Sequence, residues 1–124
     1  MTNIDALVDS FITALEGNGT DALEANVAPG AIVWHNHDRV EVDAIDNMAG
    51  IGVLGKIVSD AKFETVRLAA IEDGFVLQFV LRGTVTSSGK PFEMQNAVII
   101  ATADGKITRI DEYVDPTVGA QLSA

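Results

Sequence analysis

The amino-acid sequence predicts an α+β fold in which helices come first and an antiparallel sheet follows. Apolar residues recur at helical spacing in the first part of the chain, whereas the last half alternates β-rich runs with short glycine-containing turns. Such turns between consecutive strands are typical of hairpins, so we expect an antiparallel meander. At 124 residues the chain has the length of one domain, which we expect to cover residues 1–124.

The charge balance limits the kinds of partner. Eight basic residues against eighteen acidic ones give a formal net charge of −10. This charge disfavours nucleic acid and anionic membrane surfaces, so we expect a small apolar organic molecule as the partner. The sequence contains no cysteine and predicts no metal site and no cofactor. Its start, "MTNIDALVDSF", lacks the basic region of a signal peptide, so we expect a cytoplasmic protein.

Three helices are expected in the first half of the chain. Residues 4–16 carry an apolar stripe at spacings of three and four, made of Ile4, Leu7, Val8, Phe11, Ile12 and Leu15. A second, short helix begins after Thr20, in "DALEANV". A third is expected within residues 41–59, although its three glycines each weaken a helix by about 1 kcal/mol and indicate close packing or mobility there.

Five strands are expected. The run "AIVWHNH", residues 31–37, is rich in β-branched and aromatic residues and follows turn-forming residues. The other four strands are separated by the turns "EDG", "SSGK" and "ADGK", and they cover about 62–72, 75–86, 91–102 and 107–114.

Alternation along the strands predicts which side chains face the core. In 75–86 the wholly apolar set includes Phe79 and Leu81, so this set is assigned to the interior. In 107–114 the mostly apolar set is Thr108, Ile110, Glu112 and Val114. An acidic side chain, Glu112, is therefore expected among apolar neighbours, where burial would raise its pKa towards the range of a general base.

In two of the other strands, 31–37 and 91–102, the assignment of the two faces is less decisive. Trp34 is assigned to the interior for its large apolar area, which takes Asn36 to the same side. His35 and His37 then face outward or towards a partner subunit, and no third ligand supports a metal site. The strand 91–102 is apolar on both faces, so alternation leaves open whether Met94 and Asn96, or Gln95 and Ala97, point inward.

Three stretches carry a family resemblance. The pieces "AIVWHN" and "TSSGKPFEMQNAVIIATADGKITRIDEYVD", with a helix between them, resemble the NTF2-like superfamily, whose fold is shared by ketosteroid isomerase and SnoaL-type polyketide cyclases. The resemblance implies a cone-shaped, curved, mostly antiparallel sheet with three N-terminal helices, the NTF2-like or cystatin-like roll. Within the superfamily, the "GKIT" strand start and the acid before the tyrosine of "EYVD" are most similar to limonene-1,2-epoxide hydrolase.

The resemblance also implies roles for individual residues. Trp34 and Asn36 match an aromatic residue and an asparagine that hold the attacking water, and Glu112 matches the base. Met94 and Asn96 are placed inward. The arginine and acid of epoxide hydrolases, however, fall on Phe79 and Leu81, which removes the proton donor that ring opening needs. Related cyclases use a late-strand aspartate, for which Asp115 is the alternative.

The resulting hypothesis is a small-molecule enzyme of the isomerase, cyclase, dehydratase or hydrolase type. Glu112 would transfer a proton or activate water, with Asn36 and Asn96 as positioning residues. The expected cavity walls are Trp34, Leu54, Phe79, Leu81, Met94 and Val114. The alternative is a non-catalytic protein that binds a hydrophobic ligand or a partner. A homodimer is expected because Val76, Val80 and Tyr113 make the outer sheet face too apolar for full exposure.

Overall fold

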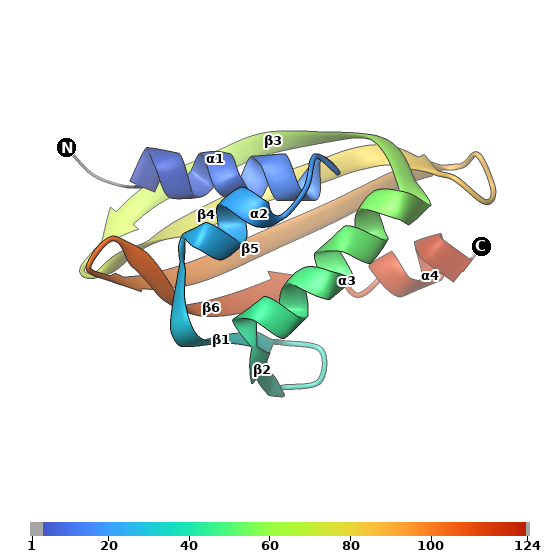
Figure 1. The fold of residues 1–124 in the computed structure, drawn as a ribbon. Coiled ribbons are helices and arrows are strands. Elements are labelled where there is room, and N and C mark those ends of the chain that lie inside the picture. The colour runs from blue at the N-terminus through green and yellow to red at the C-terminus, as the bar shows by residue number, and fades with distance from the viewer. Residues whose placement is uncertain (1–3, 124) are drawn as a thin grey trace.

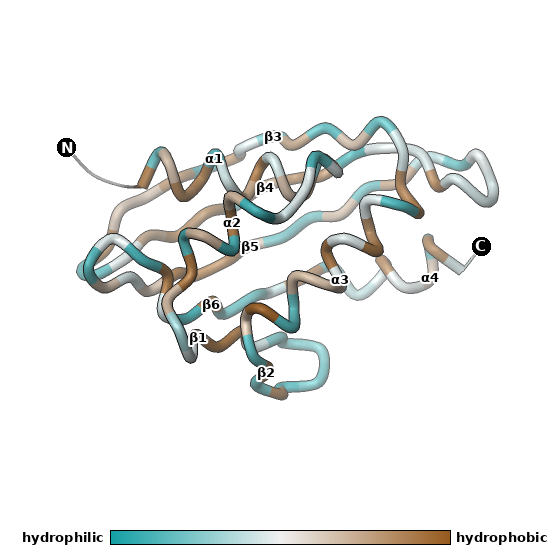
Figure 2. The backbone as a smooth tube through the Cα atoms, in the orientation of Figure 1, coloured by the Kyte–Doolittle hydropathy of each residue, from teal (hydrophilic) through white to brown (hydrophobic). Residues whose placement is uncertain are grey.

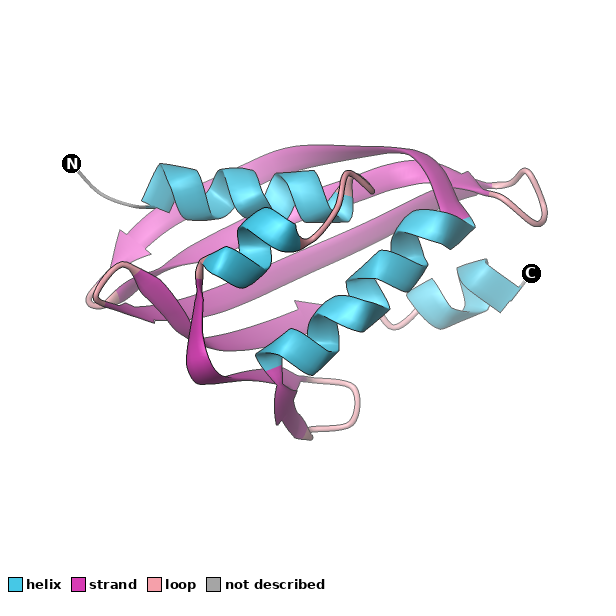
Figure 3. Ribbon diagram, in the orientation of Figure 1, coloured by secondary structure: helices cyan, strands magenta, loops and turns pink. Residues whose placement is uncertain are grey.

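The structure of the chain is a computed structural model that describes residues 4–123. One layer is a curved sheet, and the helices α1 (Ile4–Leu15), α2 (Asp21–Ala25) and α3 (Ala44–Ile57) lie over one of its faces (Figures 1 and 3). A fourth helix, α4 (Val118–Ser123), follows the last strand. The helices and strands confirm the expected α+β class, with one helix more than predicted.

The sheet is a six-stranded mixed sheet in the order β2-β1-β6-β5-β4-β3. Its strands are β1 (Val27–His35), β2 (Glu41–Asp43), β3 (Val58–Ile71), β4 (Gly74–Val85), β5 (Pro91–Ala103) and β6 (Lys106–Val114). Strands β3 to β6 form the expected antiparallel meander. Strand β1 pairs antiparallel with β2 but parallel with β6, so it lies in the same sheet as the last strand of the chain.

Some boundaries differ from the sequence-based expectation. Strand β1 begins at Val27 rather than at residue 31, which shortens the second helix to Asp21–Ala25. Residues 41–43 form β2 instead of the start of the third helix, because the Asp43 side chain caps α3 by accepting from the backbone N–H groups of Ile45 and Asp46. Strand β2 and helix α4 were not predicted.

The core lies between the helical layer and the inner face of the sheet. The apolar stripe of α1 is buried there as expected, through Leu7, Val8, Phe11 and Leu15. Figure 2 shows hydrophobic positions recurring along the helices and along the strands that they cover. Gly55 of α3 approaches the turn after α1 so closely that an added Cβ would lie 3.2 Å from the Cα of Gly17, which explains one of the helix glycines.

Helix α4 is attached through Gln121, and its Val118 and Leu122 pack against the hydrophobic core. Gln121 accepts a hydrogen bond from the backbone N–H of Glu93 and donates one to the Glu93 carbonyl, both at 2.8 Å. These two hydrogen bonds satisfy the backbone N–H and C=O of Glu93, near the start of β5. Among residues 4–123, no helix has both the length and the apolar character needed to cross a membrane.

The turn before β4 gives a test of the fold. A Cβ at Gly74 would lie 1.9 Å from the backbone oxygen of Ile100, so Gly74→Ala requires β4 and β5 to separate there. We expect this variant to lower the free energy of unfolding by about 1–3 kcal/mol. Chemical denaturation followed by circular dichroism measures the change.

The matched control is Gly52→Ala in α3, where an added Cβ would meet no atom within 4 Å. Alanine should stabilise this helix position by about 0.5–1 kcal/mol. If Gly74→Ala were as stable as the parent protein, the close approach of β4 to β5 at this turn would be contradicted.

Candidate functional site

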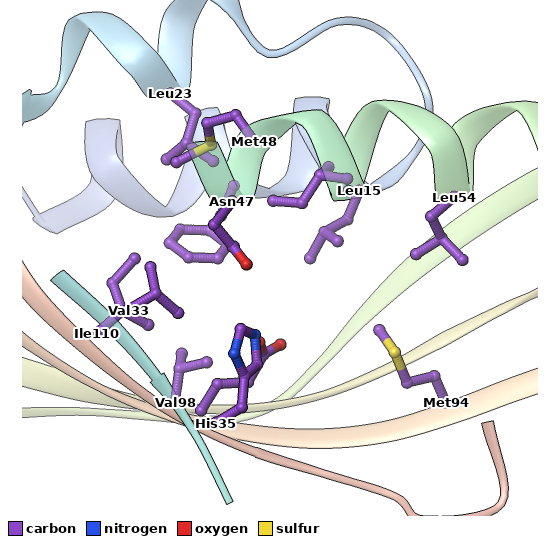
Figure 4. Close-up of a pocket in the computed structure, with 14 residues that line it drawn as sticks. Leu15, Leu23, Val33, His35, Asn47, Met48, Leu54, Met94, Val98 and Ile110 are labelled. Atoms are coloured by element: carbon purple, nitrogen blue, oxygen red, sulfur yellow. The ribbon is translucent and has the colours of Figure 1, made fainter. Parts of the chain in front are cut away.

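A cavity of about 220 Å³ lies between the helices and the inner face of the sheet (Figure 4). Most of its wall is apolar, and three side chains bring polar atoms to it: His35, Asn47 and Glu112. Gly50 lines the cavity and is also exposed, so the cavity reaches the surface beside α3. The full lining comprises Phe11, Leu15, Leu23, Val33, His35, Asn47, Met48, Gly50, Ile51, Leu54, Met94, Val98, Ile110 and Glu112.

His35 and Glu112 form a close pair on the sheet side of this cavity. The Nε2 atom of His35 lies 2.8 Å from Oε1 of Glu112. The side chains are 18% and 22% exposed, respectively, so both are largely shielded but reachable from the cavity. A carboxylate and an imidazole at hydrogen-bond distance can share and transfer a proton.

The parallel pairing of β1 with β6 creates this contact. His35 and Glu112 are direct partners in its register, and so are Val33 and Ile110 two residues earlier. Because partners in a ladder project to the same face, all four side chains point into the cavity. Val33 and Ile110 are 1% and 3% exposed, so they form a buried apolar part of the cavity wall beside His35 and Glu112.

Asn96 holds the second oxygen of the carboxylate. Its Nδ2 donates to Oε2 of Glu112 at 2.8 Å, from β5, the neighbouring strand. Asn96 is 6% exposed, and its Oδ1 is buried without a hydrogen-bond partner among the described residues. Each oxygen of Glu112 therefore has a defined neighbour, and one amide acceptor beside the pair remains free.

The contact between His35 and Glu112 changes the protonation of the imidazole. The hydrogen bond to Glu112 raises the pKa of His35, and the nearby charges of Glu112 and Asp38 act in the same direction. Burial lowers the pKa but does not cancel these effects. His35 therefore carries its proton more readily than a free histidine does.

Several residues expected at the site do lie there. Glu112, Leu54 and Met94 line the cavity, and Met94 and Asn96 are buried on the inner face, as the family resemblance implied. Asn96 reaches the site through its bond to Glu112, although it is not part of the cavity wall.

The predicted orientation of the first strand was wrong. His35, not Trp34, points into the cavity, while Trp34 lies on the outer face and makes an edge contact with Tyr113 at a centroid distance of 5.4 Å. The tryptophan thus finds apolar contact on the opposite side of the sheet. His37 is exposed and lies 3.6 Å from Asp38. No group of three or more potential metal ligands occurs within residues 4–123.

Asn36 does not line the cavity either. It follows the end of β1, and its Oδ1 accepts the backbone N–H of Val114 at 3.0 Å. Its own N–H donates to the Glu112 carbonyl, also at 3.0 Å. Asn36 therefore continues the strand pairing and holds the backbone of Glu112, and its side-chain oxygen is already occupied by Val114. Val114 is half-buried and packs against the core, and it borders a hollow on the outer face rather than the cavity.

Phe79 and Leu81 are core residues rather than cavity walls. They are 2% and 0% exposed and point inward as predicted, but neither lines the cavity. The reason is that the ring of Phe63 from β3 stacks on Phe79 at a centroid distance of 4.5 Å and fills the space over β4. No polar group stands at these two positions.

Asp115 is excluded from the cavity by its place in the chain. It follows the end of β6 and borders the hollow on the outer face. Its carboxylate accepts hydrogen bonds from the backbone N–H and the hydroxyl of Thr117, both at 2.8 Å, and these bonds lower its pKa. Glu112 therefore lines the cavity and Asp115, the alternative acid, does not.

Asn47 was missed by the sequence interpretation. It is half-buried and lines the cavity from α3, opposite the sheet. A signal was present in the sequence, because Asn47, Ile51 and Leu54 follow the spacing of one helix face.

The chain belongs to the SnoaL-like domain family, whose model matches residues 8–110. The match covers most of the chain and ends before Glu112. No curated protein matches the sequence.

Solved structures share the fold at low sequence identity. A proposed SnoaL-like polyketide cyclase from Jannaschia sp. CCS1 is 20% identical with a TM-score of 0.82, over 98% of this chain and 92% of that one. IdmH, a proposed polyketide cyclase from Streptomyces antibioticus, is 18% identical with a TM-score of 0.80, over 100% of both chains. An NTF2-like protein from Burkholderia thailandensis E264 is 20% identical with a TM-score of 0.77, over 100% of this chain and 98% of that one. These structures share the NTF2-like fold that the sequence resemblance implied.

The raised pKa of His35 predicts a pH-dependent contribution to stability. The folded protein binds this proton more tightly than the unfolded chain, whose histidine has a pKa of 6.5. The contribution is therefore fully present below pH 6.5 and lost as the pH rises through the higher folded-state pKa. His35→Gln should remove it. We expect the parent protein's stability advantage over the variant to be about 0.5–1 kcal/mol larger at about pH 5.5 than at about pH 9.

Urea denaturation of both proteins at the two pH values measures this difference, and His37→Gln serves as the control for an exposed histidine. An advantage that stayed constant, or that grew with pH, would contradict the proton-sharing contact between His35 and Glu112.

Proposed function

We propose that this SnoaL-like protein is a small-molecule enzyme that moves protons on a neutral, apolar substrate held in the cavity. The observation that carries the proposal is the pair of His35 and Glu112, 2.8 Å apart on the wall of a mainly apolar cavity. Carboxylates and imidazoles are the side chains that most often serve as general bases and acids. Both belong to adjacent, paired strands of the sheet, β1 and β6.

Glu112 is the proposed base. Its two oxygens are oriented by His35 and Asn96, and each carboxylate oxygen has a further lone pair with which to accept a substrate proton. His35 carries a further exchangeable proton beside the one that Glu112 accepts from the substrate. The pair can therefore receive a proton at a carboxylate oxygen of Glu112 and return one from either residue. The apolar wall excludes water and strengthens these electrostatic contacts.

The surroundings favour a neutral substrate. The chain carries a formal net charge of −10, and Glu112 adds a carboxylate at the cavity itself, so an anion would be repelled. The apolar lining favours a mostly hydrocarbon molecule. Isomerisation, aldol cyclisation and dehydration are the reaction types that need only such a proton-transfer pair.

Epoxide hydrolysis fits this chain less well. The proton donor of that reaction would have to stand on β4, where this chain has the buried side chains of Phe79 and Leu81. Without a general acid the ring-opening step loses a factor of about 10² to 10⁴ in rate. The two proposed polyketide cyclases among the similar structures support the proton-transfer reaction types instead.

The proposal includes a homodimer formed through the outer face of the sheet. Val66, Ile99 and Tyr113 are 59%, 40% and 45% exposed there, which is unusual for large apolar side chains on a solvated surface. Val80 is only 9% exposed, so it contributes least of the three residues, Val76, Val80 and Tyr113, from which the sequence predicted an apolar outer face. Light scattering should give about twice the chain mass of 13.1 kDa at micromolar concentration. A mass near that of one chain would contradict the dimer.

Glu112→Gln tests the catalytic proposal. Glutamine keeps the shape and one acceptor oxygen but cannot take up a proton, so turnover should fall by a factor of about 10² to 10⁴ while binding persists. Stability should change by less than about 1 kcal/mol, because the glutamine oxygen can still accept from Nδ2 of Asn96 and its new amide N–H can donate to Nε2 of a neutral His35. A panel of small neutral ketones, enones and hydroxyketones, followed by NMR, provides the activity measurement.

Val53→Ala is the control, since Val53 is 55% exposed on α3 and outside the cavity wall. Unchanged turnover in Glu112→Gln would refute the role of Glu112 as base. If instead the parent protein bound these molecules without converting any of them, the alternative of a non-catalytic ligand-binding protein would be favoured.

A further inference from the structure

The helical wall of the cavity carries a polar group that the proton-transfer pair does not use. Asn47 extends from α3, whereas His35 extends from the sheet on the opposite side (Figure 4). The neighbours of Asn47 on the same helix face, Ile51 and Leu54, are apolar. Within residues 4–123 the Asn47 carboxamide has no hydrogen bond to another residue, so its donors and its acceptor are available to a ligand.

The cavity volume limits the size of that ligand. At about 220 Å³ it is larger than a cavity of about 150 Å³ that accommodates benzene, and smaller than the range of about 300–1,000 Å³ typical of drug-sized ligands. One six-membered ring with a few small substituents fills such a space. A fused four-ring molecule does not fit without displacement of the walls.

The position of Asn47 indicates which functional group the ligand carries. A carbon-bound proton becomes acidic enough for a carboxylate when a carbonyl group stands next to it or is conjugated with it. The charge that develops on the carbonyl oxygen then needs a hydrogen-bond donor. The Asn47 carboxamide carries such a donor, across the cavity from His35 (Figure 4), and Glu112 lies beside His35.

We propose that the substrate is a neutral, single-ring ketone or enone whose oxygen is bound by Asn47 while its acidic C–H group faces Glu112. This inference rests on the proposed function and adds the substrate class and a residue that determines specificity. In the reaction, Glu112 accepts the proton, and the C–H electron pair moves into the conjugated system to give an enolate on the oxygen. Return of the proton to the same or a conjugated carbon gives back the ketone or its isomer, so no other reactant is consumed.

The first test measures binding alone. The probes are the single-ring enone isophorone, its analogue with CH₂ in place of the carbonyl, and the four-ring enone androstenedione. Calorimetric titration of the full chain should show that isophorone binds at least about ten times more tightly than the other two. The CH₂ analogue lacks one well-placed hydrogen bond, which corresponds to roughly a tenfold change in affinity. Androstenedione keeps the carbonyl group, but its four rings exceed the cavity volume. Equal or tighter binding of androstenedione, or no binding of isophorone, would overturn the substrate class.

Asn47→Leu tests the residue. Leucine is close to asparagine in size and cannot donate a hydrogen bond, so isophorone should bind about five to ten times more weakly while the CH₂ analogue binds equally well or better. Val53→Ala on the same helix should leave both affinities unchanged, because Val53 lies outside the cavity wall. If Asn47→Leu weakened both probes equally, Asn47 would be a packing residue and the inference would be wrong.

A second readout separates this inference from the proposed function. Deuterium uptake from D₂O into the acidic positions of isophorone, followed by proton NMR, reports proton transfer independently of binding. Glu112→Gln should abolish the catalysed uptake and keep the preference for the carbonyl probe. Binding that depends on Asn47 without any catalysed uptake would refute the proton-transfer function and leave the Asn47 site standing. Catalysed uptake that did not respond to Asn47→Leu would refute the Asn47 site alone.

Discussion

The parallel pairing of β1 with β6 is the constraint on which the site depends. It joins a strand from the first third of the chain to the last strand, and its register makes His35 the partner of Glu112. A shift of one residue would turn every side chain of β1 to the other face, which would bring Trp34 into the cavity and expose His35. The bonds of Asn36 to the Glu112 carbonyl and the Val114 N–H extend this pairing past the end of β1 and hold its register.

The fold could be predicted from the sequence because its signals are local. The helical stripe of α1, the glycine-containing turns and the alternation in β4 and β6 each depend on neighbouring residues, and alternation alone placed Glu112 on the inner face. At the turn before β6, Asp104 and Gly105 have φ values of 53° and 76°, as a two-residue hairpin turn requires. Helix α4 was missed because it is a short helix held by long-range contacts: Gln121 bonds to β5, and Val118 and Leu122 pack against the core.

The site was harder to predict because two of its features are long-range. The orientation of β1 was assigned from the apolar area of Trp34, but the ring packs against Tyr113 on the outer face and leaves the inner face to Val33 and His35. Likewise, alternation placed Phe79 inward correctly, yet stacking with Phe63 from β3 makes it part of the core and not of the cavity wall. For β1 the missing information was the identity of its neighbouring strand, and for Phe79 it was the packing of one side chain across a pair of strands that had been predicted.

The central claim is that His35 and Glu112 act as one proton-carrying unit, and ¹⁵N NMR titration of the His35 imidazole tests it most directly. The hydrogen bond to Glu112 is the largest of the effects that raise the pKa of His35, and burial opposes it. In Glu112→Gln the charge of the partner is lost and burial remains, so the account predicts that the pKa of His35 falls relative to the parent protein. An unchanged or higher pKa of His35 in the variant would show that the two groups do not share a proton, and would contradict the account.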